Sequence, residues 1–272
     1  MTVDRRLLAG FIRENPFQPA TSLWRAVEVA FVAHRDLPDG RGLDVGSGDG
    51  RLIGLLQSEL GKSLDVIGLD ADELEVSAAR ASGHYARVHC STADAIPEPS
   101  RSFDWVFSNS TLEHIGPIAE TLAEVARVLR PGGTFIFTVP SADFHACLRG
   151  PRLGSRERYL RDIDERCAHL RYWGDEDWRV ALQRAGMHLV SSESYLTRSE
   201  VRRWELISNL TAGVLHRVLR RPPISIQRQL RMRGGLRLPA WAALLTARVL
   251  AVGLSESRGS RRFGCRYYVA RA

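Results

Sequence analysis

Short apolar runs alternate with amphipathic stretches through the middle of the chain. The apolar runs predict strands at residues 42–45, 65–70, 88–90, 102–109 and 134–140. Apolar positions at helical spacing predict helices that begin at Arg51, Ile118 and Asp175. The second of these is expected to end at Arg130-Pro131-Gly132-Gly133, with cationic residues in its last turn and a glycine exit. Strands that alternate with helices predict a doubly wound, parallel α/β core.

The segments outside this core have a different pattern. Residues 1–38 carry apolar positions at helical spacing, with breaks at Pro16 and Pro19. A sixth strand is predicted over 188–196 and a last strand over 265–270. Between them lie an apolar stripe that Pro222-Pro223 ends and a second run, 239–254, that is apolar on nearly all sides. We therefore expect a helical cap at 1–38, a core at 39–196, a helical insertion at 197–262 and the last strand of the core at 263–272.

The turn after the first strand carries the most specific pattern. The sequence Leu43-Asp44-Val45-Gly46-Ser47-Gly48-Asp49-Gly50 places three glycines between an apolar strand and a helix. Glycine tolerates positive φ and brings no side chain, so a ligand can lie against the backbone there. A dinucleotide-binding turn reads G-x-G-x-x-G, whereas here the third glycine comes one position early and Asp44 lies inside the strand. The second strand ends in another acid, Asp70, which can accept both hydroxyls of a ribose.

These features, in this order, resemble the class I S-adenosylmethionine (SAM)-dependent methyltransferases over about residues 40–140, and in part over 170–195. The resemblance implies a seven-stranded Rossmann-like sheet, SAM as the cofactor and S-adenosylhomocysteine as its product. Asp94 would lie near the adenine amino group, Ala95 at the ring edge, and the backbone of Ser108 near the methionine ammonium. The residues that the resemblance implies for cofactor binding are Asp44, Gly46, Ser47, Gly48, Asp70, Ala71, Asp94, Ala95 and Ser108.

Methyl transfer to a hydroxyl needs a base that removes its proton. His114 follows the fourth strand, at the edge where open α/β folds bind ligands, although it could instead only order its loop. His169 and Tyr172 share a face if their stretch is helical, and would then serve as a base and a hydrogen-bonding partner, or else anchor a packed loop. His145 is a further candidate for the base. No cluster has the spacing of zinc ligands, so no metal site is expected.

The basic charge lies late in the chain. The formal net charge is +7, yet residues 41–140 hold eight basic and fourteen acidic residues. Residues 197–262 hold fourteen arginines and three glutamates. Arginines beside an apolar helix suit anionic headgroups, so the insertion is expected to be a lid, a contact between two copies or a peripheral membrane contact. Aromatic residues do not alternate with the arginines, so no nucleic acid partner is expected.

The remaining composition narrows the setting. The sequence has no run of eighteen uncharged apolar residues, and its N-terminus lacks the apolar stretch of a secretion signal. The four cysteines form no C-x-x-C pair. We therefore expect a cytoplasmic protein with reduced thiols, and peripheral contact with the inner membrane face stays open.

Two branches of the family are disfavoured by missing motifs. After the fourth strand the chain continues Ser108-Asn109-Ser110-Thr111, not the Asn/Asp-Pro-Pro-Tyr of amino-methylating enzymes, and it has no Pro-Cys pair as in cytosine-modifying enzymes. The resemblance then implies methyl transfer to a small molecule or a lipid- or glycan-linked intermediate, and we expect oxygen rather than nitrogen or carbon as the methylated atom. Two alternatives remain: a member that keeps the cofactor without methylating, such as a cyclase or a partner subunit, and a membrane-docking scaffold.

Overall fold

The computed structural model describes residues 4–35, 37–151, 153–211, 213, 237–251 and 262–272. The chain forms two compact units. The helical unit comprises Met1–Phe31, Asp143–Ala168 and Leu196–Gly264, and the sheet unit comprises Val32–Ala142, His169–Tyr195 and Cys265–Ala272. Residues 143–168, which the sequence analysis assigns to the core, thus cluster with the helical unit.

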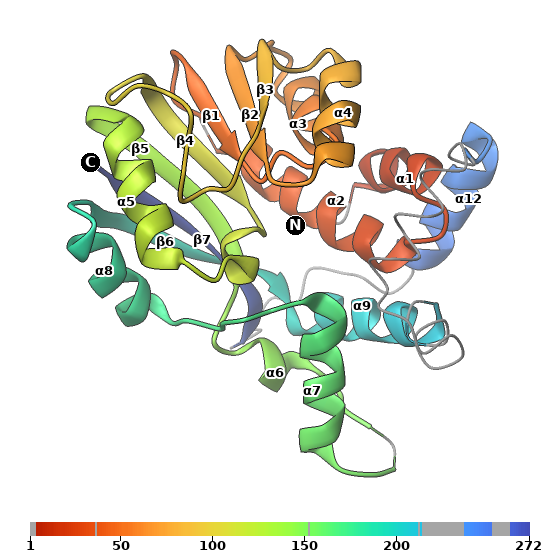
Figure 1. Ribbon diagram of the computed structural model, residues 1–272. Coiled ribbons are helices and arrows are strands. Elements are labelled where there is room, and N and C mark those ends of the chain that lie inside the picture. Colours follow the sequence, from red (N-terminus) through yellow and green to blue (C-terminus); the bar gives the residue numbers. More distant parts are fainter. Residues whose placement is uncertain (1–3, 36, 152, 212, 214–236, 252–261) are drawn as a thin grey trace. The chain divides into compact units, whose positions relative to one another are not determined.

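The sheet unit contains a seven-stranded sheet in the order β3-β2-β1-β4-β5-β7-β6 (Figure 1). Its strands are β1 (Gly42–Val45), β2 (Val66–Asp70), β3 (Arg87–Cys90), β4 (Phe103–Asn109), β5 (Leu129–Pro140), β6 (His188–Thr197) and β7 (Phe263–Arg271). Strands β1 to β5 pair in parallel, and β7 is antiparallel to β5. The expected seven-stranded Rossmann-like sheet is therefore confirmed.

Strand β1 is the point at which the strand order changes direction. It pairs with β2 on one side and with β4 on the other. In open α/β sheets, the connections that leave such a point in opposite directions open a crevice at the carboxyl ends of the strands. The glycine turn that follows Val45 lies at this crevice.

Helices cover both faces of this sheet (Figure 1). The pair α3 and α4 pack together, as do α5 and α8, and their bounds are α3 (Arg51–Leu60), α4 (Glu73–Ser82), α5 (Ile118–Val128) and α8 (Asp175–Arg184). The core beside α5 and α8 is aromatic at its centre, where the Phe137 ring lies 4.8–4.9 Å from the rings of Phe135, Trp178 and Tyr268. This apolar layer fixes the strands whose ends carry the site.

The helical unit contains α1 (Arg5–Glu14), α2 (Pro19–Ala33), α6 (Phe144–Cys147), α7 (Arg156–Cys167), α9 (Arg198–Leu210) and α12 (Ala240–Ala251). Trp24, Phe144 and Trp204 form an aromatic cluster with ring centroids 5.4–5.7 Å apart. The buried Glu205 carboxylate accepts hydrogen bonds from the Tyr159 hydroxyl at 2.6 Å and from two backbone amides. These buried contacts join α2, α6, α7 and α9 within one unit.

One local expectation is wrong, and two further segments depart from a regular buried helix. Helix α5 ends at Val128 with Leu129 in an extended conformation, so the expected glycine exit is wrong, and Gly132 takes its positive φ of 77° within β5. Residues 169–174 are not helical. Helix α12 buries Ala243, Ala247 and Ala251 and exposes other apolar side chains, which leaves the alternatives of a lid, a contact between copies and a membrane contact untested. The expected stripe beyond Leu210 and the Pro222-Pro223 break lie outside the described residues.

Within the described residues, no helix combines the length and the apolar character needed to cross a membrane. All four cysteines are free thiols, and Cys90 is exposed while Cys147 and Cys265 are buried.

Candidate functional site

The turn between β1 and α3 depends on its glycines. Gly46, Gly48 and Gly50 have φ values of 83°, 53° and 79°, in the left-handed region that favours glycine. A Cβ on Gly46 would lie 2.2 Å from the Thr111 hydroxyl oxygen, whereas a Cβ on Gly48 would meet no atom within 4 Å. Gly46 therefore permits close packing against the loop after β4, while the open space beside Gly48 leaves room for a ligand.

The Asp70 carboxylate fixes this turn from the end of β2. One oxygen accepts the Gly48 N–H at 2.9 Å, and the other accepts the Asp72 N–H at 2.9 Å. A carboxylate offers about four lone-pair positions. Each Asp70 oxygen can therefore accept a second hydrogen bond, and two vicinal hydroxyls of a ribose match that capacity.

Asp44 supports the turn from below. Its side chain is buried, with 3 % of the residue exposed, and one carboxylate oxygen accepts the Tyr85 hydroxyl at 2.6 Å. The same hydroxyl lies 3.4 Å from the Ser47 carbonyl oxygen. Burial, together with the nearby Asp44 charge, raises the pKa of Tyr85 well above its ordinary value, so the phenol keeps its proton. No sequence motif indicated Tyr85, which lies just before β3 and contacts Asp44 only in the fold.

A cavity of about 320 Å³ opens at the ends of these strands. This volume lies at the lower end of the range of small-molecule pockets. Four of the residues expected to bind the cofactor line it, namely Gly46, Asp70, Ala71 and Asp94. The other lining residues are Val45, Leu69, Ser91, Thr92, Ala93, Thr111, Ile115, Gly116 and Pro117.

The remaining residues predicted for cofactor binding lie outside the cavity lining. Gly48 contacts the cavity residue Asp70, and Ser47 is a buried residue of the turn itself. Ala95 follows the cavity residue Asp94, and its carbonyl accepts the Ser91 hydroxyl at 2.8 Å. Ser108 is fully buried, and its hydroxyl donates to the Val45 carbonyl at 3.0 Å. The Ser108 side chain therefore joins β4 to β1.

Helix α5 anchors the loop that carries Asp94. The Arg127 guanidinium donates to the Ile96 carbonyl at 2.9 Å and the Glu98 carbonyl at 2.8 Å. The Glu124 carboxylate accepts the Ile96 N–H at 2.9 Å. Hydrogen bonds from Arg127 lower the pKa of Glu124, which therefore stays ionised at neutral pH. These contacts hold one wall of the cavity in place, and nothing in the sequence pattern indicated them.

The three expected catalytic residues come together beside this cavity. His114 ends the short 3-10 helix η1 (Leu112–His114), and its ring centroid lies 5.2 Å from that of His169. The His169 Nδ1 atom lies 2.9 Å from the Tyr172 hydroxyl, so these two side chains meet although their stretch is not helical. The third histidine candidate, His145, belongs to the helical unit, where its ring bonds Asp164 at 2.8 Å.

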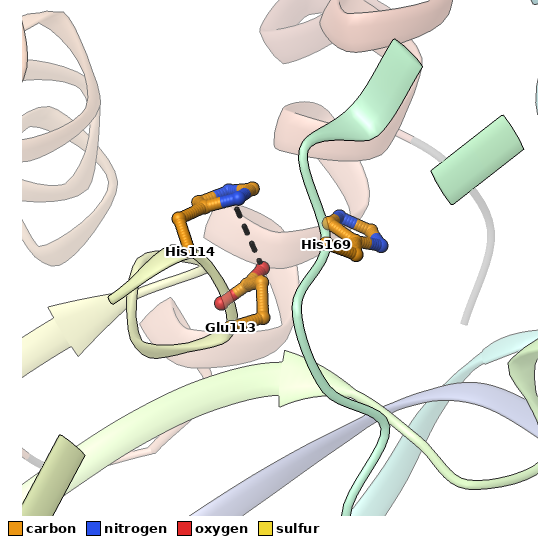
Figure 2. A group of neighbouring side chains, drawn as sticks. All are labelled: Glu113, His114 and His169. Carbon is orange, nitrogen blue, oxygen red and sulfur yellow. Dashed lines mark ion pairs between the residues drawn. The ribbon is translucent and has the colours of Figure 1, made fainter. Parts of the chain in front are cut away.

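The sequence analysis did not single out Glu113, the buried neighbour of His114. Only 1 % of Glu113 is exposed, and its carboxylate lies 3.9 Å from the His114 Nε2 atom. Figure 2 shows the Glu113 carboxylate facing the His114 imidazole, with His169 beside them on a separate segment. The only sequence signal for Glu113 was its position next to His114.

Backbone contacts fix this second segment against η1. The Leu170 N–H donates to the Glu113 carbonyl at 2.8 Å. The Arg171 guanidinium donates to the Leu112 carbonyl and, at 3.3 Å, to the Gly116 carbonyl. Burial lowers the pKa of Arg171, and the Glu113 charge opposes this effect. The segment from 169 to 172 is thus held beside residues that line the cavity.

Comparison with known proteins agrees with this arrangement. Residues 43–137 match a family model described as a methyltransferase domain. The chain is 35 % identical over 142 residues, half of each chain, to a Mycolicibacterium smegmatis protein whose name describes an S-adenosylmethionine-dependent methyltransferase. It is 30 % identical over 138 residues to dimethylglycine N-methyltransferase of Parasynechococcus marenigrum, covering 48 % of each chain. It is 36 % identical over 102 residues to ubiquinone biosynthesis O-methyltransferase of Sinorhizobium medicae, covering 36 % of this chain and 40 % of that protein. The matches thus span about half or less of these curated relatives.

A solved structure extends the similarity of fold over the whole chain. It is the complex between the Haloferax volcanii Trm112 methyltransferase activator and a methyltransferase, matched with a TM-score of 0.57 at 19 % identity over 100 % of this chain and 99 % of that chain. At this identity the match supports the fold alone. Together with the glycine turn and the strand order, the matching family model identifies residues 43–137 as a methyltransferase domain of the class I SAM-dependent type.

Proposed function

We propose that this protein transfers a methyl group from SAM to an oxygen atom of a small molecule or of a lipid- or glycan-linked intermediate. The observation that carries the proposal is the Asp70 carboxylate, which orders the glycine turn through Gly48 while it lines the adjoining cavity. The acceptor, the atom methylated and the activity of the whole chain are all parts of this proposal.

The residues present fit the cofactor. Asp70 would accept the ribose hydroxyls, for which each of its oxygens retains lone-pair capacity. Asp94 lines the same cavity and would accept the adenine amino group, with Ala95 at the ring edge. Asp44 lies in β1 and Ser108 lies in β4, and we place the methionine end of SAM near these two strands. Gly46, Ser47 and Ala71 would contact the cofactor mainly through the backbone.

The histidines beside the cavity favour oxygen as the acceptor atom. When bound, SAM supplies a methyl group on a sulfonium, which an aligned acceptor atom displaces in line. A hydroxyl acceptor must lose its proton during this step. His114 has a side chain that is 38 % exposed and lies beside the buried Glu113 carboxylate, which would stabilise the imidazolium. His169 and Tyr172 would position the acceptor from the opposite segment.

The first experiment measures cofactor binding and turnover separately. Calorimetric titration with SAM and S-adenosylhomocysteine should show one site, and incubation with cell extract should convert labelled SAM to S-adenosylhomocysteine. His114→Asn should leave SAM affinity within about twofold and reduce turnover by about 100-fold or more. Absence of binding for both nucleosides would refute the proposal, whereas binding without turnover in any extract would favour the non-methylating alternative.

Peripheral membrane contact remains a second candidate function, because α12 presents apolar side chains to solvent. Trp241, Leu245 and Val249 are 71 %, 55 % and 61 % exposed. Replacing all three with Ser or Thr should abolish flotation with vesicles rich in anionic phosphatidylserine. If the unchanged protein does not float with such vesicles, the membrane-docking function is refuted while the enzymatic proposal stands.

A further inference from the structure

Three side chains with metal-binding atoms converge beside the cavity. A carboxylate oxygen of Glu113 and ring nitrogens of His114 and His169 all lie within 4.8 Å of one another. They come from η1 and from the separate segment that begins at His169 (Figure 2). Two imidazoles and one carboxylate are the protein ligands of catalytic zinc sites and of many mononuclear iron(II) sites.

We propose that Glu113, His114 and His169 bind a divalent first-row transition-metal ion, with coordination positions left for an oxygen ligand. No metal site was expected from the sequence, because no cluster has the spacing of zinc ligands, and His169 lies fifty-five positions beyond His114. Only the fold brings the third ligand to the first two. Imidazole ligands favour zinc, iron or cobalt over magnesium, which prefers oxygen ligands.

The separations require only a small closure of the side chains. Ligand atoms about 2.1 Å from a tetrahedral ion lie about 3.4 Å apart. The separation between the Glu113 carboxylate and His114 Nε2 is 3.9 Å, and the other separations do not exceed 4.8 Å. Rotations about the side-chain bonds of Glu113 and the two histidines cover this difference.

Burial gives the Glu113 carboxylate a reason to attract a cation. Only 1 % of its side chain is exposed, and a buried carboxylate needs compensating charge. The Arg171 guanidinium lies close enough to feel the Glu113 charge, and it would oppose a second cation. Its donors, however, are directed to the Leu112 and Gly116 carbonyls. A metal ion would therefore share the neutralisation of Glu113 with Arg171.

Contacts around the ligands hold His169 in a suitable state. Its Nδ1 atom lies 2.9 Å from the Tyr172 hydroxyl. When Nδ1–H donates to that oxygen, Nε2 carries the lone pair that a metal requires. The hydrogen bond from the Leu170 N–H to the Glu113 carbonyl, at 2.8 Å, fixes the distance between the two segments. Tyr172 is thus a positioning residue for this site.

Three protein ligands leave at least one position for an acceptor oxygen. A His114 imidazole that binds the ion cannot also accept a proton, so the ion would take over the role of the base: a hydroxyl bound to it loses its proton more easily, as does zinc-bound water, whose pKa falls to about 7. This consequence rests on the proposed function, whereas metal binding itself does not. The cavity residues Thr111 and Ile115 flank η1, so an acceptor at the ion would lie close to the proposed cofactor.

Metal binding can be measured without any substrate. The protein is prepared without a polyhistidine tag, stripped with a chelator, and titrated with Co²⁺ by visible absorption and with Zn²⁺ by competition against a chromophoric chelator. We expect one equivalent with a Kd of about 1 µM or tighter. His169→Gln and Glu113→Gln should each weaken binding by more than about 100-fold, and Tyr172→Phe by about tenfold.

A matched control comes from the same unit. His89 bonds Glu98 at 2.6 Å, so His89→Gln also breaks a histidine–carboxylate pair but should leave metal affinity unchanged. Binding of less than about 0.2 equivalents, or an equal loss in His89→Gln and His169→Gln, would overturn the inference. Circular dichroism of the metal-free proteins checks that each variant is folded, and calorimetry with S-adenosylhomocysteine measures cofactor binding separately. Cofactor binding without metal binding overturns this inference alone, whereas metal binding without cofactor binding supports it and overturns the proposed function.

Discussion

Asp70→Asn is the sharpest test of the proposed ribose contact, because the amide keeps the shape of the carboxylate and removes its charge. Both oxygens of Asp70 accept backbone N–H groups, one from Gly48 and one from Asp72. Asparagine offers one oxygen and one NH₂ group, so one of these N–H groups would face a donor. The single oxygen would also serve only one ribose hydroxyl well.

The expected loss follows from the contacts removed. A hydrogen bond to a charged group contributes about 1.5–3 kcal/mol, and 1.4 kcal/mol corresponds to a tenfold change in Kd. Asp70→Asn should therefore weaken SAM binding by about 10- to 100-fold, and Asp70→Ala, which loses both ribose contacts, by about 100-fold or more. The free energy of unfolding should fall by about 1–2 kcal/mol, because a backbone N–H of the turn loses its acceptor.

Two ligands separate a direct ribose contact from an effect on the turn. The Kd of S-adenosylhomocysteine and of its 2′-deoxy analogue is measured by calorimetry for the unchanged protein and for Asp70→Asn. If Asp70 accepts the 2′-hydroxyl, the unchanged protein distinguishes the two ligands by about tenfold or more, and the variant distinguishes them far less. If both ligands weaken by the same factor in the variant, Asp70 acts only through the turn and the ribose assignment is refuted.

Two further predictions follow from the site. Gly46→Ala should lower the free energy of unfolding by about 2 kcal/mol or more in urea titration, because its new methyl group would lie 2.2 Å from the Thr111 hydroxyl oxygen. Gly48→Ala should lower the free energy of unfolding by only about 1 kcal/mol and should instead weaken S-adenosylhomocysteine binding. Equal stabilities of the two variants would contradict this reasoning. Glu124→Gln should lower the free energy of unfolding by about 1–2 kcal/mol at pH 7. This difference should disappear as the pH falls through the pKa of Glu124, which Arg127 holds below its ordinary value of 4.5. A difference that stays constant or grows at acidic pH would show that the ion pair contributes nothing.

Local pattern was sufficient for the parts of the fold that depend on neighbours in sequence. The glycine turn and the acid at the end of β2 were expected from spacing, and Asp70 does contact Gly48. The strands were predicted because a central parallel strand is apolar on both faces. The sequence could not place Tyr85 against Asp44, because that contact joins residues forty-one positions apart and Tyr85 forms part of no motif.

The expectations that failed depended on competition between local signals. The Arg130-Pro131-Gly132-Gly133 run predicted that the helix would end at a glycine. Instead, the backbone becomes extended at Leu129, because β5 begins there and pairs with β4. His169 and Tyr172 were expected to share a face on a helix, yet they meet in a non-helical segment that Arg171 holds against the loop after β4. The all-round apolar run at α12 gave no indication of which face the fold would bury.

The loop from Thr111 to Pro117 has two sets of neighbours. Thr111 and Ile115 line the cavity, while Glu113 and His114 between them face His169. So short a stretch cannot adjust to an occupant on one side without moving the groups that serve the other. We therefore expect SAM in the cavity and an acceptor held beside Glu113, His114 and His169 to change each other's affinity by the same factor. This thermodynamic linkage between the methyl donor and the acceptor would arise from a single turn of backbone.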